Sequence, residues 1–205
     1  MPKVMTIGVV LFEGFELLDV FGPLEMFGNY PDKFEIIMVA ENTGLVASAQ
    51  GPQSKVERVF SDEIQYDILL VPGGQGTRVE VNNSHLLKWL TDQAKLAEYV
   101  TSVCTGSAIL AKAGLLDGLR ATGNKMNFAF VMSQGPKVDW VKEARWVEHG
   151  KFFTSSGVSA GMDMSLGLIE KVLGKEAAKQ SAIWAEYDWH EDSSWDPFAK
   201  IHGLV

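Results

Sequence analysis

The sequence predicts a flavodoxin-like α/β fold, in which a doubly wound, mainly parallel sheet carries helices on both faces. Short aliphatic segments alternate with segments of helical periodicity over most of the chain, which is the order typical of a parallel sheet. No internal repeat, low-complexity segment or linker interrupts this order. The 205 residues suffice for one hydrophobic core and are too few for two typical domains. We therefore expect residues 1–205 to form a single domain, with an aromatic C-terminal tail from about residue 187.

The first half of the chain contains strands separated by one helix and one hairpin. β-Branched and aliphatic residues predict the strands, and turn residues such as Gly51 and Pro52 predict the hairpin. The expected elements are a strand over 6–11, a helix over 19–27, a strand over 34–39, a β-hairpin over 44–59 and a strand over 68–71. The last of these is an uninterrupted aliphatic run, which is typical of a strand buried on both faces.

The second half of the chain contains more predicted helix. Ser84 is expected to cap a helix whose apolar residues recur at helical spacing. The further expected elements are a strand over 99–103, a helix over 105–113, a strand over 120–122, a helix through residue 130, an antiparallel strand pair that turns at 149–150, and helices over 160–173 and 175–187. Because binding sites of such sheets lie at the carboxyl ends of the strands, chemistry is expected where these strands end.

Composition and charge narrow the range of partners. The chain carries 26 acidic and 18 basic residues and has no basic stripe that would neutralise a phosphate backbone, so we expect no nucleic-acid partner. Its single cysteine cannot form an internal disulfide, which is compatible with a reducing compartment. No uncharged apolar segment reaches the ~20 residues that cross a bilayer, so we expect no membrane association. These features together predict a cytoplasmic protein.

The most specific local feature is a cysteine between a hydrophobic strand and a helix. Residues 99–103 form the expected strand, Cys104 follows it, and the next helix begins at Thr105. This is the arrangement of a nucleophile elbow, which presents a reactive side chain at the carboxyl edge of a sheet. A lone cysteine can also be a small buried hydrophobe, but the small polar neighbours favour a reactive thiol. We expect the helix N-terminus to lower the pKa of this thiol.

A glycine-rich turn follows the preceding buried strand. Gly73 and Gly74 allow backbone N–H groups to point into the same crevice, and with the N–H of Thr105 these groups are expected to form an oxyanion hole. The turn also bears a weak likeness to a dinucleotide-binding loop. The G-x-G-x-x-G pattern is absent, however, and the capped helix begins only near Ser84. We therefore expect no cofactor.

These segments together resemble the ThiJ/PfpI family, which belongs to the class I glutamine-amidotransferase-like superfamily. The similar motifs cover nearly the whole chain and lie at residues 17–25, 70–74, 103–107, 113–118 and 157–163. Within the family, the patterns L-D-x-x-G-P and S-V-C-T-G are most similar to those of isonitrile hydratases. The resemblance implies a flavodoxin-like fold, a small-molecule substrate and a homodimer.

The resemblance also implies roles for three residues. Cys104 would attack the terminal carbon of R–N≡C, Asp19 would shuttle protons, and Thr105 would be a hydrogen-bonding neighbour. One carboxyl group that cycles between its two states serves both steps, because the carbon gains a proton as the thioimidate forms and water later needs a base. If Asp19 stays protonated and donates a hydrogen bond to the sulfur, it also favours the thiolate. The alternative role of Asp19 is that of a helix N-cap, and one residue can fill both roles.

One departure from the family pattern concerns residue 124. Many relatives carry histidine in the segment that reads 121–124 here, whereas this chain carries Asn124, which we expect to border the pocket. The change weakens a protease, amidase or glyoxalase hypothesis that depends on a Cys–His pair. The histidines lack a partner motif and metal-ligand spacing, so we expect surface or packing roles for them and no metal site. They are His85, His149, His190 and His202.

A cysteine-dependent lyase that hydrates isonitriles is the leading hypothesis, and three alternatives remain. The first is a glyoxalase, deglycase or amidase of the same family. The second is a redox-responsive protein in which Cys104 is oxidised without turnover. The third is the ligand-sensing part of a regulator, which the acidic composition and the single domain disfavour. The aromatic tail is expected to dock on the body of the protein or on a second subunit rather than to line the pocket.

Overall fold

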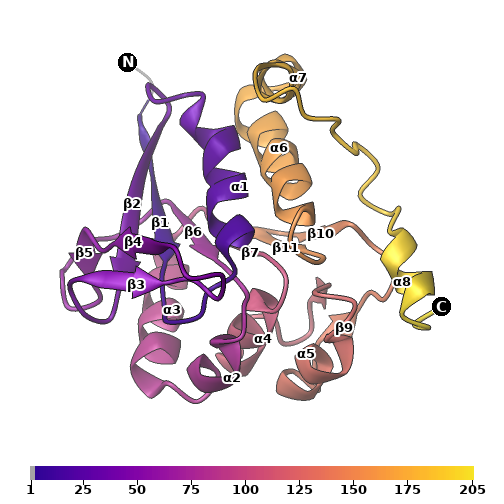
Figure 1. Cartoon of the computed structure of the whole chain (residues 1–205), viewed down its shortest axis with the longest axis horizontal. Coiled ribbons are helices and arrows are strands. Elements are labelled where there is room, and N and C mark those ends of the chain that lie inside the picture. The colour runs from indigo at the N-terminus through magenta and orange to yellow at the C-terminus, as the bar shows by residue number, and fades with distance from the viewer. Residues whose placement is uncertain (1–2) are drawn as a thin grey trace.

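A seven-stranded sheet forms the centre of the molecule (Figure 1). The structure is a computed structural model and describes residues 3–205. The strand order is β10-β11-β7-β6-β1-β2-β5, and every neighbouring pair is parallel except β10 with β11. The strands of this sheet are β1 (Met5–Val10), β2 (Phe34–Ala40), β5 (Arg58–Val59), β6 (Ile68–Val71), β7 (Tyr99–Ser102), β10 (Trp146–His149) and β11 (Phe152–Ser155). The predicted doubly wound, mainly parallel sheet is confirmed.

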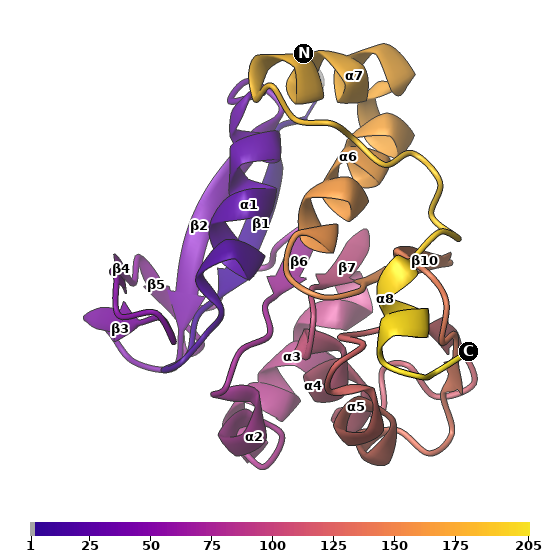
Figure 2. The same ribbon diagram turned by 45° about the vertical axis from the view of Figure 1, so that its right-hand side comes forward.

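Helices cover both faces of the sheet, as Figures 1 and 2 show. One group packs together on one face and comprises α1 (Leu17–Gly28), α6 (Ala160–Leu173) and α7 (Lys175–Trp184). The other group lies on the opposite side and comprises α2 (Thr77–Glu80), α3 (Ser84–Leu96), α4 (Gly106–Lys112) and α5 (Phe128–Gln134). All four residues of β6 are buried, as an aliphatic strand between two helical layers requires.

Two small strand pairs lie outside the central sheet. β3 (Leu45–Ala47) and β4 (Gln53–Lys55) form an antiparallel hairpin, and β8 (Arg120–Ala121) pairs in parallel with β9 (Asp139–Trp140). The hairpin predicted over 44–59 is therefore shorter than expected. Its last residues form β5, which pairs in parallel with β2 and completes the edge of the central sheet.

Two helix starts differ from the prediction. α3 begins at Ser84, but its N-cap is Asn83, whose side chain accepts hydrogen bonds from the backbone N–H groups of His85 and Leu86. α1 begins at Leu17, so Asp19 lies inside its first turn and not at the N-cap position. The capping role considered for Asp19 is therefore wrong, and its carboxyl group is free for a different role.

The C-terminal tail docks on the body of the protein. After α7, which ends at Trp184 and not at residue 187, the chain crosses to the short helix α8 (Pro197–Ile201; Figures 1 and 2). The hydroxyl group of Tyr187 donates to the Asp163 carboxylate over 3.0 Å. The α8 helix was not predicted, because five residues give too short a periodicity to recognise. No helix within residues 3–205 combines the length and the apolar character needed to span a membrane.

Candidate active site

Four neighbouring strands bring the candidate residues to one edge of the sheet. β11, β7, β6 and β1 are consecutive in the strand order. Cys104 follows β7, Gly73 follows β6, Asp19 lies in the helix after β1, and Val158 follows β11. Because these strands are parallel, their carboxyl ends meet, and segments that are far apart in the sequence become neighbours.

Cys104 occupies a strained turn between β7 and α4. Its φ angle is 60°, a left-handed conformation that non-glycine residues rarely adopt. The backbone N–H of Cys104 donates to the Ser156 carbonyl over 3.0 Å, which ties the turn to the segment after β11. At Gly106 a Cβ atom would lie 2.2 Å from the Val71 carbonyl oxygen, so the turn requires glycine there. The nucleophile-elbow geometry predicted from the sequence is therefore present.

Asp19 is a fully buried carboxyl group beside this cysteine. Its Oδ2 atom accepts a hydrogen bond from the Gly73 N–H over 2.8 Å, whereas its Oδ1 atom has no hydrogen-bond partner of ordinary geometry among the described residues. Burial raises the pKa of Asp19 to about 8, and the Gly73 N–H and the nearby Cys104 only partly oppose this effect. Asp19 is therefore mainly protonated at neutral pH, with one oxygen unpaired.

This buried acid has a measurable cost in stability. The pKa of Asp19 is about 8 in the folded protein against 3.8 for an ordinary aspartate. Between these values the unfolded chain loses the proton that the folded protein keeps, so stability falls as the pH rises from about 4 to about 8. At 1.36 kcal/mol for each pKa unit, the effect at pH 7 has an upper bound of roughly 4 kcal/mol.

Asp19→Asn is therefore expected to raise the free energy of unfolding at pH 7 by about 2 to 4 kcal/mol, because the amide keeps the shape without the ionisation. The gain should vanish near pH 4, where aspartate is protonated in both states. Urea unfolding at the two pH values measures it. Asp163→Asn is the matched control, since it breaks a buried ion pair with Arg145 at 2.7 Å and should destabilise the protein. Equal or lower stability of Asp19→Asn at pH 7 would contradict the raised pKa.

The expected oxyanion hole at Gly73 and Gly74 is not seen. The N–H of Gly73 donates to Asp19, and the N–H of Gly74 donates to the Thr105 hydroxyl over 3.0 Å. The same hydroxyl lies 3.1 Å from that of Thr77. Because both glycine N–H groups have internal partners, the prediction is wrong for these residues. Thr105 instead connects the elbow to the glycine turn, and Gly73 holds the carboxyl group of Asp19.

Three other donors surround the Cys104 sulfur. They are the backbone N–H groups of Val158 and Thr105 and the side-chain amide of Asn124, and all three lower the pKa of the thiol. Burial has the larger effect and raises the pKa of Cys104 above its ordinary value, and charge on Asp19 raises it further. The lowered thiol pKa expected from the sequence is therefore wrong. A seven-residue helix does not compensate for the loss of water around the sulfur.

Asn124 is held so that its amide nitrogen serves the sulfur. Its Oδ1 atom accepts hydrogen bonds from the backbone N–H of Asn127 over 2.8 Å and from the Asn127 side chain over 3.0 Å. Arg78 in turn donates to the Asn127 side chain over 3.0 Å. With its oxygen engaged, Asn124 presents only N–H donors to Cys104. An amide cannot accept the thiol proton as histidine does, and Asp19 is the titratable side chain beside the thiol.

A pocket of about 590 Å³ opens over the sulfur. It is lined by Glu16, Gly74, Gln75, Arg78, Cys104, Thr105, Asn124, Met126, Asn127 and Val158. None of the four histidines lines it, as expected, although His202 borders a neighbouring hollow. The pocket therefore contains a cysteine and hydrogen-bond donors, whereas Asp19 is fully buried beside the cysteine and outside the pocket lining. A cysteine with a neighbouring acid suits addition to an electrophilic carbon.

Comparison with protein-family models gives a match to the DJ-1/PfpI family over residues 5–171. The chain belongs to this family. It is 35% identical over 183 residues to an isonitrile hydratase from Pseudomonas putida, and the match covers 89% of this chain and 78% of that enzyme. It is also 36% identical over 110 residues to the HTH-type transcriptional regulator GbdR from Pseudomonas aeruginosa. This match covers 54% of this chain and only 29% of the regulator.

Solved structures confirm the DJ-1/PfpI fold. A THiJ/PfpI family protein from Pseudomonas syringae superposes with a TM-score of 0.82 at 29% identity, covering 92% of this chain and 77% of that one. DJ-1 from Toxoplasma gondii in an oxidised form gives a TM-score of 0.78 at 23% identity, covering 91% and 100%. The ThiJ/PfpI resemblance deduced from the motifs and the flavodoxin-like fold are thus both confirmed.

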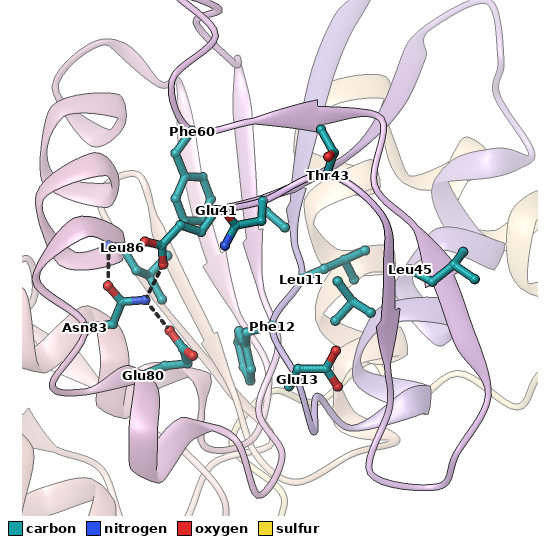
Figure 3. Close-up of a pocket in the computed structure, with 13 residues that line it drawn as sticks. Leu11, Phe12, Glu13, Glu41, Thr43, Leu45, Phe60, Glu80, Asn83 and Leu86 are labelled. Carbon is teal, nitrogen blue, oxygen red and sulfur yellow. Dashed lines mark hydrogen bonds between the residues drawn. The ribbon is translucent and has the colours of Figure 1, made fainter.

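A second hollow of the DJ-1/PfpI fold lies at the ends of β1 and β2, and Figure 3 shows it. It measures about 300 Å³ and carries Glu13, Glu41 and Glu80 around apolar walls. The Asn83 side chain donates to Glu41 and Glu80 over 2.9 Å each, so two of these carboxylates already have partners. No set of three metal-ligating side chains with suitable placement is found among the described residues. Without a nucleophile, this hollow is not the candidate reaction site.

Sequence reasoning missed two features of the candidate site. Val158 is one, because its φ angle of 45° is an outlier for a β-branched residue and aims its N–H at the sulfur. The motif at 157–163 contains this residue, but backbone strain leaves no mark in the sequence. The second is Asn127, which orients Asn124 from three residues further on. The spacing of the two asparagines was the only available indication.

Proposed function

We propose that this DJ-1/PfpI protein is a lyase that adds water to small isonitriles, R–N≡C, and releases N-substituted formamides. The observation that carries the proposal is the buried, protonated carboxyl group of Asp19, whose Oδ1 atom is unpaired beside the strained Cys104. Buried polar groups without partners are rare and are often found at catalytic sites. The 35% identity to an isonitrile hydratase supports the same reaction.

In the first step Cys104 adds to the terminal carbon of the isonitrile. Both Cys104 and Asp19 begin in their neutral forms, because burial raises the pKa of each group. The carboxyl group of Asp19 gives its proton to the carbon and takes the thiol proton in exchange, while the sulfur–carbon bond forms. The product is a thioimidate, R–N=CH–S, on Cys104. A neutral pair serves this addition because it creates no free charge, which buried groups would stabilise poorly.

In the second step water releases the product. Asp19 takes a proton from water as the new oxygen–carbon bond forms, and gives its own proton to the nitrogen. The intermediate R–NH–CH(OH)–S then collapses, the carbon–sulfur bond breaks, and the hydroxyl proton returns to sulfur through Asp19. The formamide leaves, and both residues regain their starting forms. One carboxyl group is therefore sufficient for every proton transfer.

The N–H donors around the sulfur stabilise negative charge while bonds to sulfur form and break. The Val158 and Thr105 N–H groups and the Asn124 amide lower the pKa of Cys104, and the same interaction favours a sulfur atom that carries partial negative charge. Their positions are fixed before the reaction by backbone geometry and by Asn127. The thiol is thus neutral at rest and stabilised when its charge develops.

The alternative activities receive less support from this site. A glyoxalase, deglycase or amidase that uses a Cys–His pair lacks its base here, since Asn124 holds the position and no histidine lines the pocket. A redox role requires a reactive thiolate, whereas burial raises the pKa of Cys104. The regulator GbdR shares only part of its length with this chain.

A panel of candidate substrates tests the proposed reaction. Wild-type protein is incubated separately with an alkyl isonitrile, with methylglyoxal and with a simple amide, and Cys104→Ala is the control in each case. We expect formamide from the isonitrile with wild type only. Turnover of methylglyoxal or of the amide in the absence of formamide would replace the proposal with one of the alternatives.

Two further expectations accompany the proposal, namely a cytoplasmic location and a homodimer. α1 carries Leu18 and Phe21 on its surface, and both are about two-fifths exposed. Such side chains favour burial at an interface between subunits. We therefore expect sedimentation at micromolar concentration to give twice the 22.5 kDa mass of the chain. A species with the mass of one chain under these conditions would contradict the dimer.

A further inference from the structure

A third hollow adjoins the pocket of Cys104. It measures about 230 Å³, and it shares Asn124, Met126 and Val158 with the reaction pocket. Two of these three residues supply hydrogen-bond donors to the sulfur. We call this hollow the side chamber, and its remaining lining residues are Lys125, Ser156, Gly157, Ser159, Phe198 and His202. The two hollows therefore adjoin at these three residues, next to the residues that surround the sulfur.

One wall of the side chamber belongs to the C-terminal tail. Phe198 and His202 lie in and directly after α8, which is separated by more than ninety residues from Cys104 in the sequence. The tail aromatics were expected to dock elsewhere and not to line a pocket, so the position of Phe198 corrects that expectation. Figure 2 shows how the chain runs from α7 to place α8 at this side of the molecule.

This wall is fixed by buried groups. Asp196 caps α8 by accepting a hydrogen bond from the Phe198 N–H over 2.9 Å, and Pro197 fits the first helical position. The other carboxylate oxygen of Asp196 lies 3.5 Å from the Lys125 Nζ atom, and both side chains are buried. Lys125 directly follows Asn124, so the loop that holds α8 in place also carries the amide donor beside the sulfur. The wall is therefore part of the folded site and not a loose end.

The side chamber presents a mainly apolar surface, and Lys125 and His202 are the only ionisable residues of its lining. No carboxylate lines it, and the only lysine of the lining is turned to Asp196, to the Thr122 hydroxyl and to the Ala144 carbonyl. Met126, Val158 and Phe198 supply the apolar contacts. An apolar cavity of about 150 Å³ holds a benzene molecule, so this hollow is large enough for a six-membered ring. Because no carboxylate lines the chamber, a cation placed there would gain no ionic partner, and an uncharged apolar group fits its surface better.

We propose that the side chamber binds the substituent R of the isonitrile, that R is an uncharged apolar group, and that Phe198 determines the preference for bulky over small R. The assignment rests on the proposed hydration reaction for the identity of the substrate. The position of the chamber beside the reaction pocket does not depend on the identity of the substrate, so the proposal also applies to the apolar group of any reagent that modifies Cys104. This makes the binding of R measurable without turnover.

The test compares two thiol reagents that differ only in their apolar group. Second-order rate constants for alkylation of Cys104 are measured with N-cyclohexyl iodoacetamide and with iodoacetamide, and their ratio is compared among wild type, Phe198→Ala and Ile201→Ala. We expect the ratio to fall on the order of tenfold in Phe198→Ala, because a hydrophobic contact to the ring is removed. Ile201 lies on the same helix, is 68% exposed and does not line the chamber, so Ile201→Ala should keep the wild-type ratio.

The same ratio is then measured as kcat/KM for cyclohexyl against methyl isocyanide. If the alkylation ratio falls in Phe198→Ala while neither isocyanide is hydrated, the assignment of the side chamber is supported and the proposed function is wrong. If the alkylation ratio is unchanged in Phe198→Ala, or falls equally in Ile201→Ala, the assignment of the chamber is overturned even with active hydration. Phe198→Leu is the second variant, and it should give an intermediate ratio. Circular dichroism of each variant verifies that it is folded.

Discussion

Replacing Asp19 by asparagine is expected to lower kcat/KM for isonitrile hydration by about 10²- to 10⁴-fold. The amide retains an oxygen that can accept the Gly73 N–H, so the fold and the pocket remain. It cannot exchange protons with the thiol, the substrate carbon and water, and the proposed mechanism routes each transfer through this group. Steady-state kinetics of wild type and variant measure the loss. Glu25→Gln, on the exposed side of the same helix, is the matched control and should retain wild-type activity.

The dependence of kcat/KM on pH shows which protonation state of Asp19 is active. The first step uses the protonated form of Asp19, whose pKa is raised to about 8 by burial. The wild-type kcat/KM should therefore be level below about pH 7 and fall as the pH rises through 8, since kcat/KM reports ionisations of the free enzyme. Asp19→Asn should lack this fall. A wild-type rate that instead increases through pH 8 would show that the ionised carboxylate is the active form.

Cys104→Ala is expected to reduce isonitrile hydration by at least about 10⁴-fold, because loss of a covalent nucleophile leaves only binding and the N–H donors. The side chain is 5% exposed and alanine is smaller, so the variant should fold with little change in stability. Formamide production measured by gas chromatography over several hours sets the limit of detection. Substantial hydration by this variant would mean that water adds to the isonitrile directly and that the elbow cysteine is not the nucleophile.

The sequence was sufficient for the fold and for the main residues of the site. Buried aliphatic runs followed by turn residues marked the parallel strands, and the strand that leads into Cys104 identified the elbow. Asp19 and Asn124 were located by motifs in segments far from the cysteine. Cys104 and Asp19 converge because β7 and β1 are strands of one parallel sheet and end at the same edge. Asn124 follows β8, outside the central sheet, and reaches the site through its backbone N–H, which donates to the Cys104 carbonyl over 3.2 Å.

The remaining features depend on burial and on backbone geometry. The predicted direction of the shift in the thiol pKa was wrong, because the sequence reveals the helix after Cys104 but not the desolvation of the sulfur. The glycine turn was expected to supply free N–H groups, but Gly73 and Gly74 use theirs to hold Asp19 and Thr105. The backbone N–H of Val158 is a donor because of a strained conformation, which cannot be recognised from the residue pattern.

The tail illustrates a further limit of sequence reasoning. Its aromatic residues were recognised, but their partners were not, because a docking site formed by Lys125 and Asp163 lies on other elements of the chain. The buried ion pair of Lys125 with Asp196 joins residues 71 positions apart, and periodicity carries no information over that distance. The lining of the side chamber by Phe198 follows from this contact and was visible only in the structure.

Covalent catalysis by Cys104 is tested most directly by a rapid-quench experiment with ¹³C-labelled isonitrile and excess enzyme. Samples are quenched in acid during the first turnover, digested, and analysed by mass spectrometry. We predict that the peptide containing Cys104 carries the mass of the whole isonitrile, and that this adduct appears and decays as labelled formamide forms. Formation of formamide in the first turnover with no label on the Cys104 peptide at any time would contradict it.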